Sequence, residues 1–246
     1  MTAIDPGTSG HRYFLDLHCH TRASFDSLSS PASVVRSAAA RGLTHIAITD
    51  HDRVDGAFEA RDAAPPGLSV IVGQELRTTG GDLIAAFIER PIPAGLSAEE
   101  AISAVREQGG LVGLPHPFDR FRGSMLRNAT FRAIADRVDW IEAHNARAVG
   151  SGNEKAASFA RDRGLPGVAV SDAHTTVEIG VAYVAIDEDP STPEGLLKAL
   201  GSAELVTGRA SYVVRAFMPV AKTIQRLRGN RRAPSVGSSP HHPVAR

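Results

Sequence analysis

The sequence predicts an α/β fold: a parallel sheet with helices outside it, as in a barrel or an open α/β sheet. Three observations carry this prediction. Short apolar runs alternate with helical segments along most of the 246 residues. Histidine and carboxylate residues follow several of these runs directly, where the carboxyl ends of parallel strands form active sites. The chain length is typical of a single α/β barrel.

Seven segments have the short, apolar and largely β-branched character of buried strands. Most of them are followed at once by polar residues or by a turn signal. The expected strands are 13–17, 44–49, 68–72, 83–88, 111–114, 138–141 and 168–170.

The expected helices begin at capping signals and end at glycine. Ser30 precedes a proline at the first helical position, and Ser97 stands three residues before Glu100 in capping-box spacing. A third helix covers 153–163 and ends before Gly164, and a last one starts at Thr192. We therefore expect one domain over residues 1–220. The basic stretch 221–246, which becomes rich in Pro, Ser and Gly, is expected to be a flexible tail.

Composition limits the function classes. The formal net charge is zero, so no long-range positive field is available for a long nucleic-acid groove. A small anionic substrate stays compatible, because bound metal ions supply their own charge. The single cysteine, Cys19, cannot form an internal disulfide, and residues 1–10 do not resemble a signal peptide. No apolar run reaches the roughly 20 residues of a membrane helix. We expect a soluble cytoplasmic protein and leave its oligomeric state open.

The clustered histidines and carboxylates predict a polynuclear metal site. His18 and His20 are two apart at a strand end, so both rings can face one metal while Cys19 points away and packs. Asp172 and His174 repeat this spacing. Neutral imidazole and ionised carboxylate are the ligands that hold Zn, Mn or Fe without thiolate.

Three further positions fit the same site. His51 follows a buried strand between Asp50, which could orient a neighbouring ligand, and Asp52, which could cap the next helix. Glu75 comes after another strand, where a carboxylate can bridge two cations. His116 lies between two prolines that fix its direction. For Asp26, in a Ser-rich loop, the residues alone leave a turn role and a ligand role open.

The stretch 144–147 could line the site. Arg147 is suited to gripping a substrate phosphate, with Asn145 beside it, although an exposed surface arginine is the alternative. His144 could also face the site. The chain has no Gly-x-Ser-x-Gly motif and no phosphate-binding loop, which favours metal-activated water over a protein nucleophile.

Taken in order, these clusters resemble the PHP family (polymerase and histidinol phosphatase domain). The resemblance runs from about residue 13 to residue 210. Its motifs are Asp-Leu-His-Cys-His-Thr at 16–21, Ala-Ile-Thr-Asp-His-Asp at 47–52, Gly-Gln-Glu-Leu at 73–76, Pro-His-Pro-Phe at 115–118, Ile-Glu-Ala-His-Asn-Ala-Arg at 141–147 and Ser-Asp-Ala-His at 171–174.

The resemblance implies a distorted (β/α)7 barrel with two or three divalent ions at the C-terminal rim of its strands. It implies three ligand groups, which are His18, His20, Glu75 and Asp172 for the first metal, Glu75 and His116 for the second, and Asp26, His51 and His174 for the third. One departure stands out. Many members have a histidine after the bridging glutamate, where this chain has Gly80, Gly81 and Asp82. Asp82 either substitutes as an oxygen ligand or does not reach the metal.

The expected activity is hydrolysis of a phosphate ester by a metal-bound hydroxide. The expected substrate is a nucleotide or a short oligonucleotide, so the enzyme would be a phosphatase, a nucleotidase or a short-substrate 5'-3' exonuclease. Two alternatives stay open. One is a small-metabolite phosphatase such as histidinol-phosphate phosphatase, and the other is a non-catalytic module that keeps the metals for stability.

Overall fold

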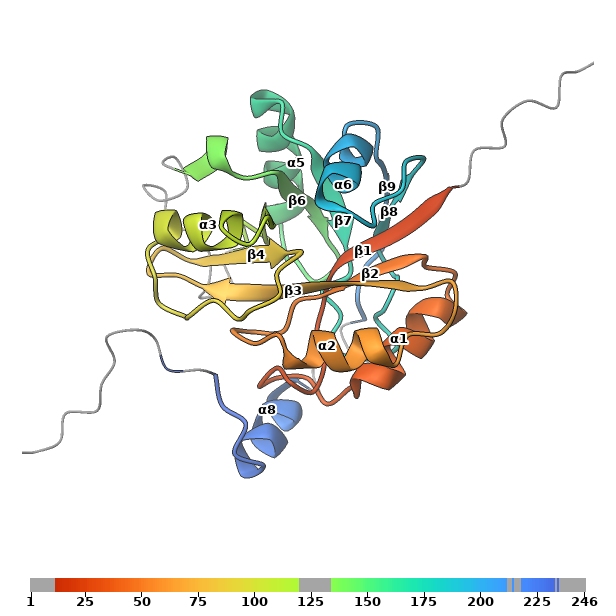
Figure 1. Ribbon diagram of the computed structural model, residues 1–246, viewed down its shortest axis with the longest axis vertical. Coiled ribbons are helices and arrows are strands. Elements are labelled where there is room, and N and C mark those ends of the chain that lie inside the picture. The colour runs from red at the N-terminus through yellow and green to blue at the C-terminus, as the bar shows by residue number, and fades with distance from the viewer. Residues whose placement is uncertain (1–11, 120–133, 212–213, 215–217, 233, 235–246) are drawn as a thin grey trace, which may run out of the picture.

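A single mixed sheet organises the molecule (Figure 1). The computed structural model describes residues 12–119, 134–211, 214, 218–232 and 234. Within these residues the sheet has nine strands in the order β7-β6-β5-β4-β3-β2-β1-β8-β9. The strands are β1 (Tyr13–Cys19), β2 (His45–Ile48), β3 (Ser69–Arg77), β4 (Asp82–Ala86), β5 (Leu111–Leu114), β6 (Trp140–Asn145), β7 (Gly167–Val170), β8 (Tyr183–Ile186) and β9 (Glu204–Val206).

The α/β class and the barrel-like sheet are confirmed, but the sheet is not parallel throughout. Strands β1, β2 and β3 are parallel, as are β5, β6 and β7. Strand β4 runs antiparallel to both neighbours. The four residues between Arg77 and Asp82 explain this, because a parallel connection needs a crossover of a dozen residues or more. Strands β8 and β9, which the sequence analysis did not predict, extend the β1 edge in antiparallel pairing.

The sheet curls until β1 approaches β7, and this seam closes at the end where the parallel strands finish. Cys19 forms a parallel bridge with Ala173, three residues beyond β7. The backbone N–H of His20 donates to the carbonyl of Ala173 at 2.8 Å. Asp16 accepts a hydrogen bond from the backbone N–H of Ser171 at 3.1 Å. Strand β1 is therefore hydrogen-bonded to the chain directly after β7, next to the clustered histidines and aspartates.

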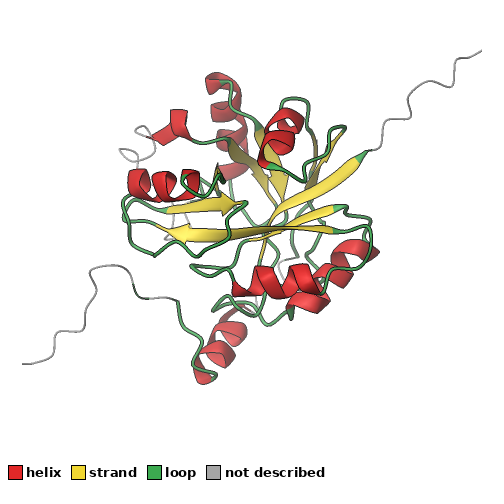
Figure 2. Cartoon of the chain, in the orientation of Figure 1, coloured by secondary structure: helices red, strands yellow, loops and turns green. Residues whose placement is uncertain are grey.

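Helices cover the outside of the curled sheet (Figure 2). Ser30 caps the first helix and Ser97 forms a full capping box with Glu100, as expected. One apolar cluster packs β2 against the first two helices, through residues such as Ile46, Val34 and Ala57. The described helices are α1 (Pro31–Ala40), α2 (Asp55–Asp62), α3 (Ala98–Arg106), the 3-10 turn η1 (Ala135–Arg137), α5 (Gly152–Arg163), α6 (Pro193–Leu200) and α8 (Met218–Leu227). None of them has the length and apolar character needed to cross a bilayer.

Helix α8 (Met218–Leu227) extends into the stretch 221–246, where a flexible tail was expected. It belongs to the C-terminal segment, which we define as residues 218–232. The side-chain amide of Gln225 is buried and donates to the backbone carbonyls of Arg22, Ser24 and Ser27 at 2.6–2.9 Å. The basic, polar composition gave no sign of this helix. Its attachment depends on hydrogen bonds from an amide to backbone carbonyls and buries little apolar surface. Residues 235–246 of the expected tail lie outside the described residues.

Candidate metal centre

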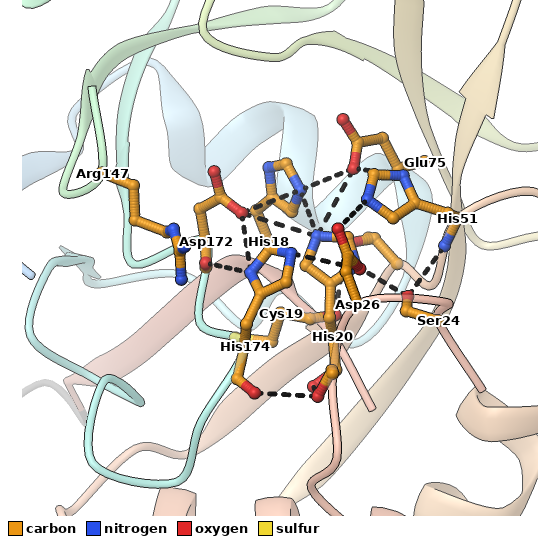
Figure 3. A network of polar contacts seen from close by, with 12 residues as sticks. His18, Cys19, His20, Ser24, Asp26, His51, Glu75, Arg147, Asp172 and His174 are labelled. Carbon is orange, nitrogen blue, oxygen red and sulfur yellow. Dashed lines mark hydrogen bonds and ion pairs between the residues drawn. The ribbon is translucent and has the colours of Figure 1, made fainter. Parts of the chain in front are cut away.

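The histidines and carboxylates proposed as metal ligands converge at one end of the sheet (Figure 3). All but Asp26 come from the ends of β1, β2, β3, β5 and β7, as parallel strand topology predicts, and Asp26 lies in the loop between β1 and α1. Seven of them are buried, and the His51 side chain is 10% exposed. The residues brought together are His18, His20, Asp26, His51, Glu75, His116, Asp172 and His174.

Three of these side chains, His18, His20 and Asp172, present ligand atoms within 4.8 Å of one another, and Glu75 lies beside the two rings. The Nε2 atoms of His18 and His20 lie 3.0 Å apart, and each lies 3.4 Å from Oε2 of Glu75. Oδ1 of Asp172 lies 3.7 Å from the first ring nitrogen and 3.5 Å from the second. In a tetrahedral zinc site, bonds of about 2.0–2.1 Å place neighbouring ligand atoms about 3.3 Å apart. The donor atoms therefore fit a divalent cation.

Hydrogen bonds to the outer ring nitrogens turn the inner nitrogens toward the space between these atoms. Nδ1 of His18 lies 2.6 Å from Oε1 of Glu142, and a carboxylate can only accept, so this Nδ1 carries the proton. Nδ1 of His20 lies 3.0 Å from the hydroxyl of Ser24. Both Nε2 atoms therefore face the centre, and either a proton or a cation must lie between them. This is the tautomer in which ring nitrogens bind metals.

Asp50 is connected to His20 through the hydroxyl of Ser24. The Ser24 hydroxyl donates to Oδ1 of Asp50 at 2.8 Å, which leaves its lone pairs to accept from the Nδ1–H of His20. Thr21 holds the same carboxylate through its backbone N–H and its hydroxyl, both at 2.6 Å. Burial raises the pKa of Asp50, and the hydrogen bonds from Thr21 and Ser24 oppose that rise.

Glu75 lies at the middle of the cluster and contacts both sides of it. Its Oε2 lies 3.0 Å from Nδ1 of His51, and its Oε1 lies 3.3 Å from Nε2 of His116. Neither ring nitrogen of His116 has a hydrogen-bond partner, and the same is true of Nδ1 of His51. Buried polar atoms of this kind are rare unless an unseen water or ion satisfies them. The bridging position predicted for Glu75 agrees with this geometry.

Asp26 joins the remaining two histidines. Its two oxygens lie 3.5 Å from Nε2 of His51 and 3.5 Å from Nε2 of His174. Nδ1 of His174 lies 2.9 Å from the backbone carbonyl of Asp172, which fixes that ring with Nε2 inward. Burial would raise the pKa of Asp26, but the positive charges of His51 and His174 outweigh burial and lower it well below its usual value. Asp26 thus lies among ligand candidates and not in an isolated turn.

Asp82 faces the cluster as well. One of its oxygens, one of Glu75 and a ring nitrogen of His51 lie within 4.8 Å of one another. Its Oδ1 has no hydrogen-bond partner, whereas its Oδ2 accepts from Nη2 of Arg232 at 3.0 Å. Burial and the charge of Glu75 raise the pKa of Asp82, and Arg232 opposes that rise. The side chain therefore reaches the centre, but it is already paired with an arginine.

Two ligand candidates adopt a backbone conformation that costs energy. His116 has φ 27° and Asp172 has φ 52°, both in the left-handed region that residues other than glycine rarely adopt. Such strain persists where the surrounding structure fixes the residue, and it clusters at functional sites. Hydrogen bonds from the backbone N–H of His116 to Glu142 and from Asn145 to Asp172 provide that fixation here.

The two residues expected to hold a substrate phosphate have other partners. Both side-chain N–H groups of Asn145 are used, since Nδ2 donates to Glu142 at 2.8 Å and to Asp172 at 3.0 Å. Asn145 therefore positions carboxylates and cannot also bind phosphate in this arrangement. Arg147 is buried, and its Nη1 donates to Glu178 at 2.8 Å. Figure 3 places it beside Asp172 and His174, on the side of the cluster opposite His51.

Sequence reasoning missed three supporting residues and left one open. Glu142 was given no role beyond its place after the expected strand 138–141 and in the motif at 141–147, although it holds His18, Asn145 and the backbone of His116. Glu178 accepts from the backbone N–H groups of His174 and Thr175 at 3.1 Å each. Arg232 lies in the stretch expected to be a flexible tail, and no sequence motif there indicated a role at the metal centre. His144, left open as a site residue, contacts the carbonyl of Gly208 at 2.7 Å instead.

Comparison with known proteins identifies the family of this chain. The family described as PHP domain matches residues 16–137, and a family described as PHP-associated matches residues 150–205. An uncharacterised protein of Methanocaldococcus jannaschii is 34% identical over 147 residues, which cover 53% of this chain and 81% of the relative. The chain belongs to the PHP domain family. PHP-type phosphoesterases depend on metals, and the clusters described above are this chain's candidate ligands.

Two proteins to which this chain is similar have names that refer to nucleases. A 5'-3' exoribonuclease of Haemophilus influenzae is 31% identical over 117 residues, 42% of each chain. A Bacteroides vulgatus protein containing a predicted PHP-like metal-dependent phosphoesterase has a TM-score of 0.67 at 20% identity, covering 82% of this chain and 67% of that one. The lesion-specific endonuclease Q of Pyrococcus furiosus has a TM-score of 0.63 at 15% identity, covering 94% and 74%. The two structures show that the fold is shared.

Proposed function

We propose that this PHP protein is a metal-dependent phosphoesterase that hydrolyses a phosphate ester of a nucleotide or a short oligonucleotide. One observation carries the proposal above the others. The inward-facing Nε2 atoms of His18 and His20 lie among the carboxylates of Glu75 and Asp172 at the spacing of metal ligands. A buried set of this kind, at the active-site end of an α/β barrel, serves metal-assisted hydrolysis.

We assign two ligand groups around the shared carboxylate of Glu75. His18, His20, Glu75 and Asp172 would hold the first ion. His51, His174 and Asp26 would hold a second ion. His116, which faces the other oxygen of Glu75, would be a further ligand on that side. Manganese, zinc and iron all suit this mixture of imidazole and carboxylate.

Divalent cations, when bound, lower the pKa of water and neutralise the charge of phosphoryl oxygens. The chain's own part is to hold the ligands rigid. Glu142 fixes His18, and Asp50 fixes His20 through Ser24. The burial of these groups excludes bulk water, which strengthens the electrostatic interactions within the site.

Two considerations support a nucleotide or a short oligonucleotide. The names of an exoribonuclease relative and an endonuclease Q neighbour both refer to nucleic acids. The neutral charge of this chain argues against a long groove, because proteins that contact 6–10 phosphates rely on dense positive charge. A small substrate held by its terminal phosphate fits both considerations.

The test is a phosphate-release screen with Mn, Zn or Fe supplied in turn, over mononucleotides, short and long single strands, and small phosphorylated metabolites. Asp172→Asn is the matched inactive variant, since it removes a ligand charge at nearly unchanged volume. The proposal expects release from nucleotides or short strands that Asp172→Asn abolishes. It also expects kcat/KM to fall by less than about tenfold between 50 and 200 mM salt, where a protein that follows the backbone would lose about a thousandfold in affinity. Release from metabolites alone, or no release at all, would contradict it.

A further inference from the structure

The C-terminal segment is attached to the loop that carries Asp26. Three carbonyls of that loop accept from the buried amide of Gln225. Asn230 donates from its side-chain amide to the carbonyls of Arg22, Ala23 and Ser24 at 3.0–3.2 Å. These bonds join residues about 200 positions apart in the sequence. They fix the end of the segment at the rim of the metal centre.

Arg232, which this attachment places at the rim, inserts between two carboxylates. Its Nη2 donates to Asp82 at 3.0 Å and its Nε donates to Asp52 at 3.2 Å. Both carboxylate side chains are at most 1% exposed, whereas the arginine side chain is 24% exposed. The guanidinium carbon also lies 5.8 Å from the centre of the Phe25 ring, next to Asp26. The arginine thus reaches the centre from solvent.

Asp82 needs a cation. It is buried beside Glu75 and His51, and a buried carboxylate is costly unless a positive charge or a metal pairs with it. A divalent ion at Asp82 and Glu75 could meet that need. Arg232 already meets it, and a guanidinium cannot lose its charge at any ordinary pH. A guanidinium and a divalent ion on the same carboxylate would repel each other.

We propose that Arg232 is a tethered cation that takes the place of a metal ion at Asp82, so that this centre holds two metals and not three. The inference rests on the proposed metal-ligand assignment and deepens it. Arg232 acts as a positioning residue, because it sets the number of ions without itself contacting the reacting atoms. The C-terminal segment is then part of the metal centre.

The experiment counts metal ions per chain by elemental analysis and by titration with Mn²⁺ alone, without substrate. Wild type is expected to bind two ions. Arg232→Ala is expected to bind a third, and the double variant Arg232→Ala/Asp82→Ala should return to two. Arg231→Ala, which removes an exposed neighbouring arginine, is the matched control and should bind two.

A second variant guards against misfolding of Arg232→Ala, which removes the ion-pair partner of the buried Asp82 while Asp52 keeps its contacts with Arg77. The variant Gln225→Ala/Asn230→Ala removes both amides that attach the segment to the loop and leaves Arg232 in the chain, so it should raise occupancy of the third site by mass action. An unchanged count of two in both variants would overturn the inference and leave the proposed function intact. A fall below two in Arg232→Ala would overturn it as well, since the arginine would then support a ligand. A wild-type protein that binds no metal would refute the proposed function itself.

Discussion

The Nε2 atoms of His18 and His20 lie 3.0 Å apart, and the pKa values of the two rings move in opposite directions. Burial lowers the pKa of His18, but Asp172, Glu142 and Glu75 outweigh it and raise that pKa well above its usual value. Burial and the charge of His174 lower the pKa of His20. In the metal-free protein the proton between the two rings is therefore carried by Nε2 of His18, and this N–H donates a hydrogen bond to Nε2 of His20. A metal ion in the same space replaces that proton.

Ser24→Ala tests the chain from Asp50 to His20. The change removes the hydroxyl that accepts from the Nδ1–H of His20 and donates to Asp50. Loss of such a supporting contact typically weakens metal binding by about 10- to 100-fold. The measurement is a Mn²⁺ or Zn²⁺ titration of the variant beside Ser103→Ala, which removes an exposed hydroxyl of α3. Equal affinities for the two variants would show that Ser24 does not orient His20.

Gly56→Ala tests how closely α2 must approach the same carboxylate. A Cβ atom at Gly56 would overlap Oδ2 of Asp50 and the hydroxyl of Thr21. We expect a loss of roughly 1–3 kcal/mol in the free energy of unfolding, the usual cost of overpacking, together with weaker metal binding. In the control Gly201→Ala, the added Cβ would meet only the carbonyl of Lys198, at 3.5 Å. A Gly56→Ala protein with normal stability and metal affinity would contradict this reading of the packing.

Arg147→Ala distinguishes a supporting role from a phosphate-binding one. Arg147 pairs with Glu178, which holds the backbone N–H groups beside His174. Removing one partner of a buried ion pair costs about 3–5 kcal/mol in the free energy of unfolding, so the variant should unfold at lower denaturant. Glu178→Gln should weaken metal binding, because Glu178 holds the backbone N–H of the ligand candidate His174. If Arg147 grips phosphate instead, its removal would raise KM about 10- to 100-fold while Glu178→Gln leaves KM unchanged.

Metal affinity should rise with pH. Burial lowers the pKa of His51, but Glu75 and Asp26 outweigh burial and raise it to about 9 in the metal-free protein. Because this folded-state pKa exceeds the usual value of about 6.5, protonated His51 stabilises the metal-free fold below that pH. This stability is lost as the pH rises toward about 9. Metal ions need the neutral ring, so binding near pH 7 should release protons.

Calorimetric titrations in buffers of different ionisation enthalpy count the protons released. His51→Gln should release fewer protons than wild type and should show a weaker dependence of metal affinity on pH. Proton release that is the same in wild type and variant would mean that the titrating group lies elsewhere in the cluster.

The sequence predicted the α/β class and the gathering of the ligand candidates, because both follow from local signals, and the resemblance to the PHP family added the barrel. Apolar runs mark strands, and parallel strands end at one rim. It did not predict the antiparallel β4, although the short stretch from Arg77 to Asp82 excludes a parallel crossover. That restriction comes from chain length between strands, which periodicity alone does not register.

The supporting contacts were harder to foresee. Asn145 was read as a phosphate ligand because a polar residue at a strand end can serve either a substrate or another side chain. Only the three-dimensional arrangement shows that its amide is used by Glu142 and Asp172. Arg232 lies 150 residues from its partner Asp82, and no pattern along the chain connects the two. Long-range ion pairs of this kind have no signature in a single sequence.

The seam between β1 and β7 gives the metal centre a mechanical consequence. His18 and His20 lie on one side of the seam and Asp172 and His174 on the other, with the bridge from Cys19 to Ala173 between them. An ion bound by residues on both sides would cross-link β1 to the chain after β7. Metal binding would then make local opening of the seam less frequent. The backbone N–H of His20 lies on that seam, and its hydrogen–deuterium exchange should slow when metal is bound.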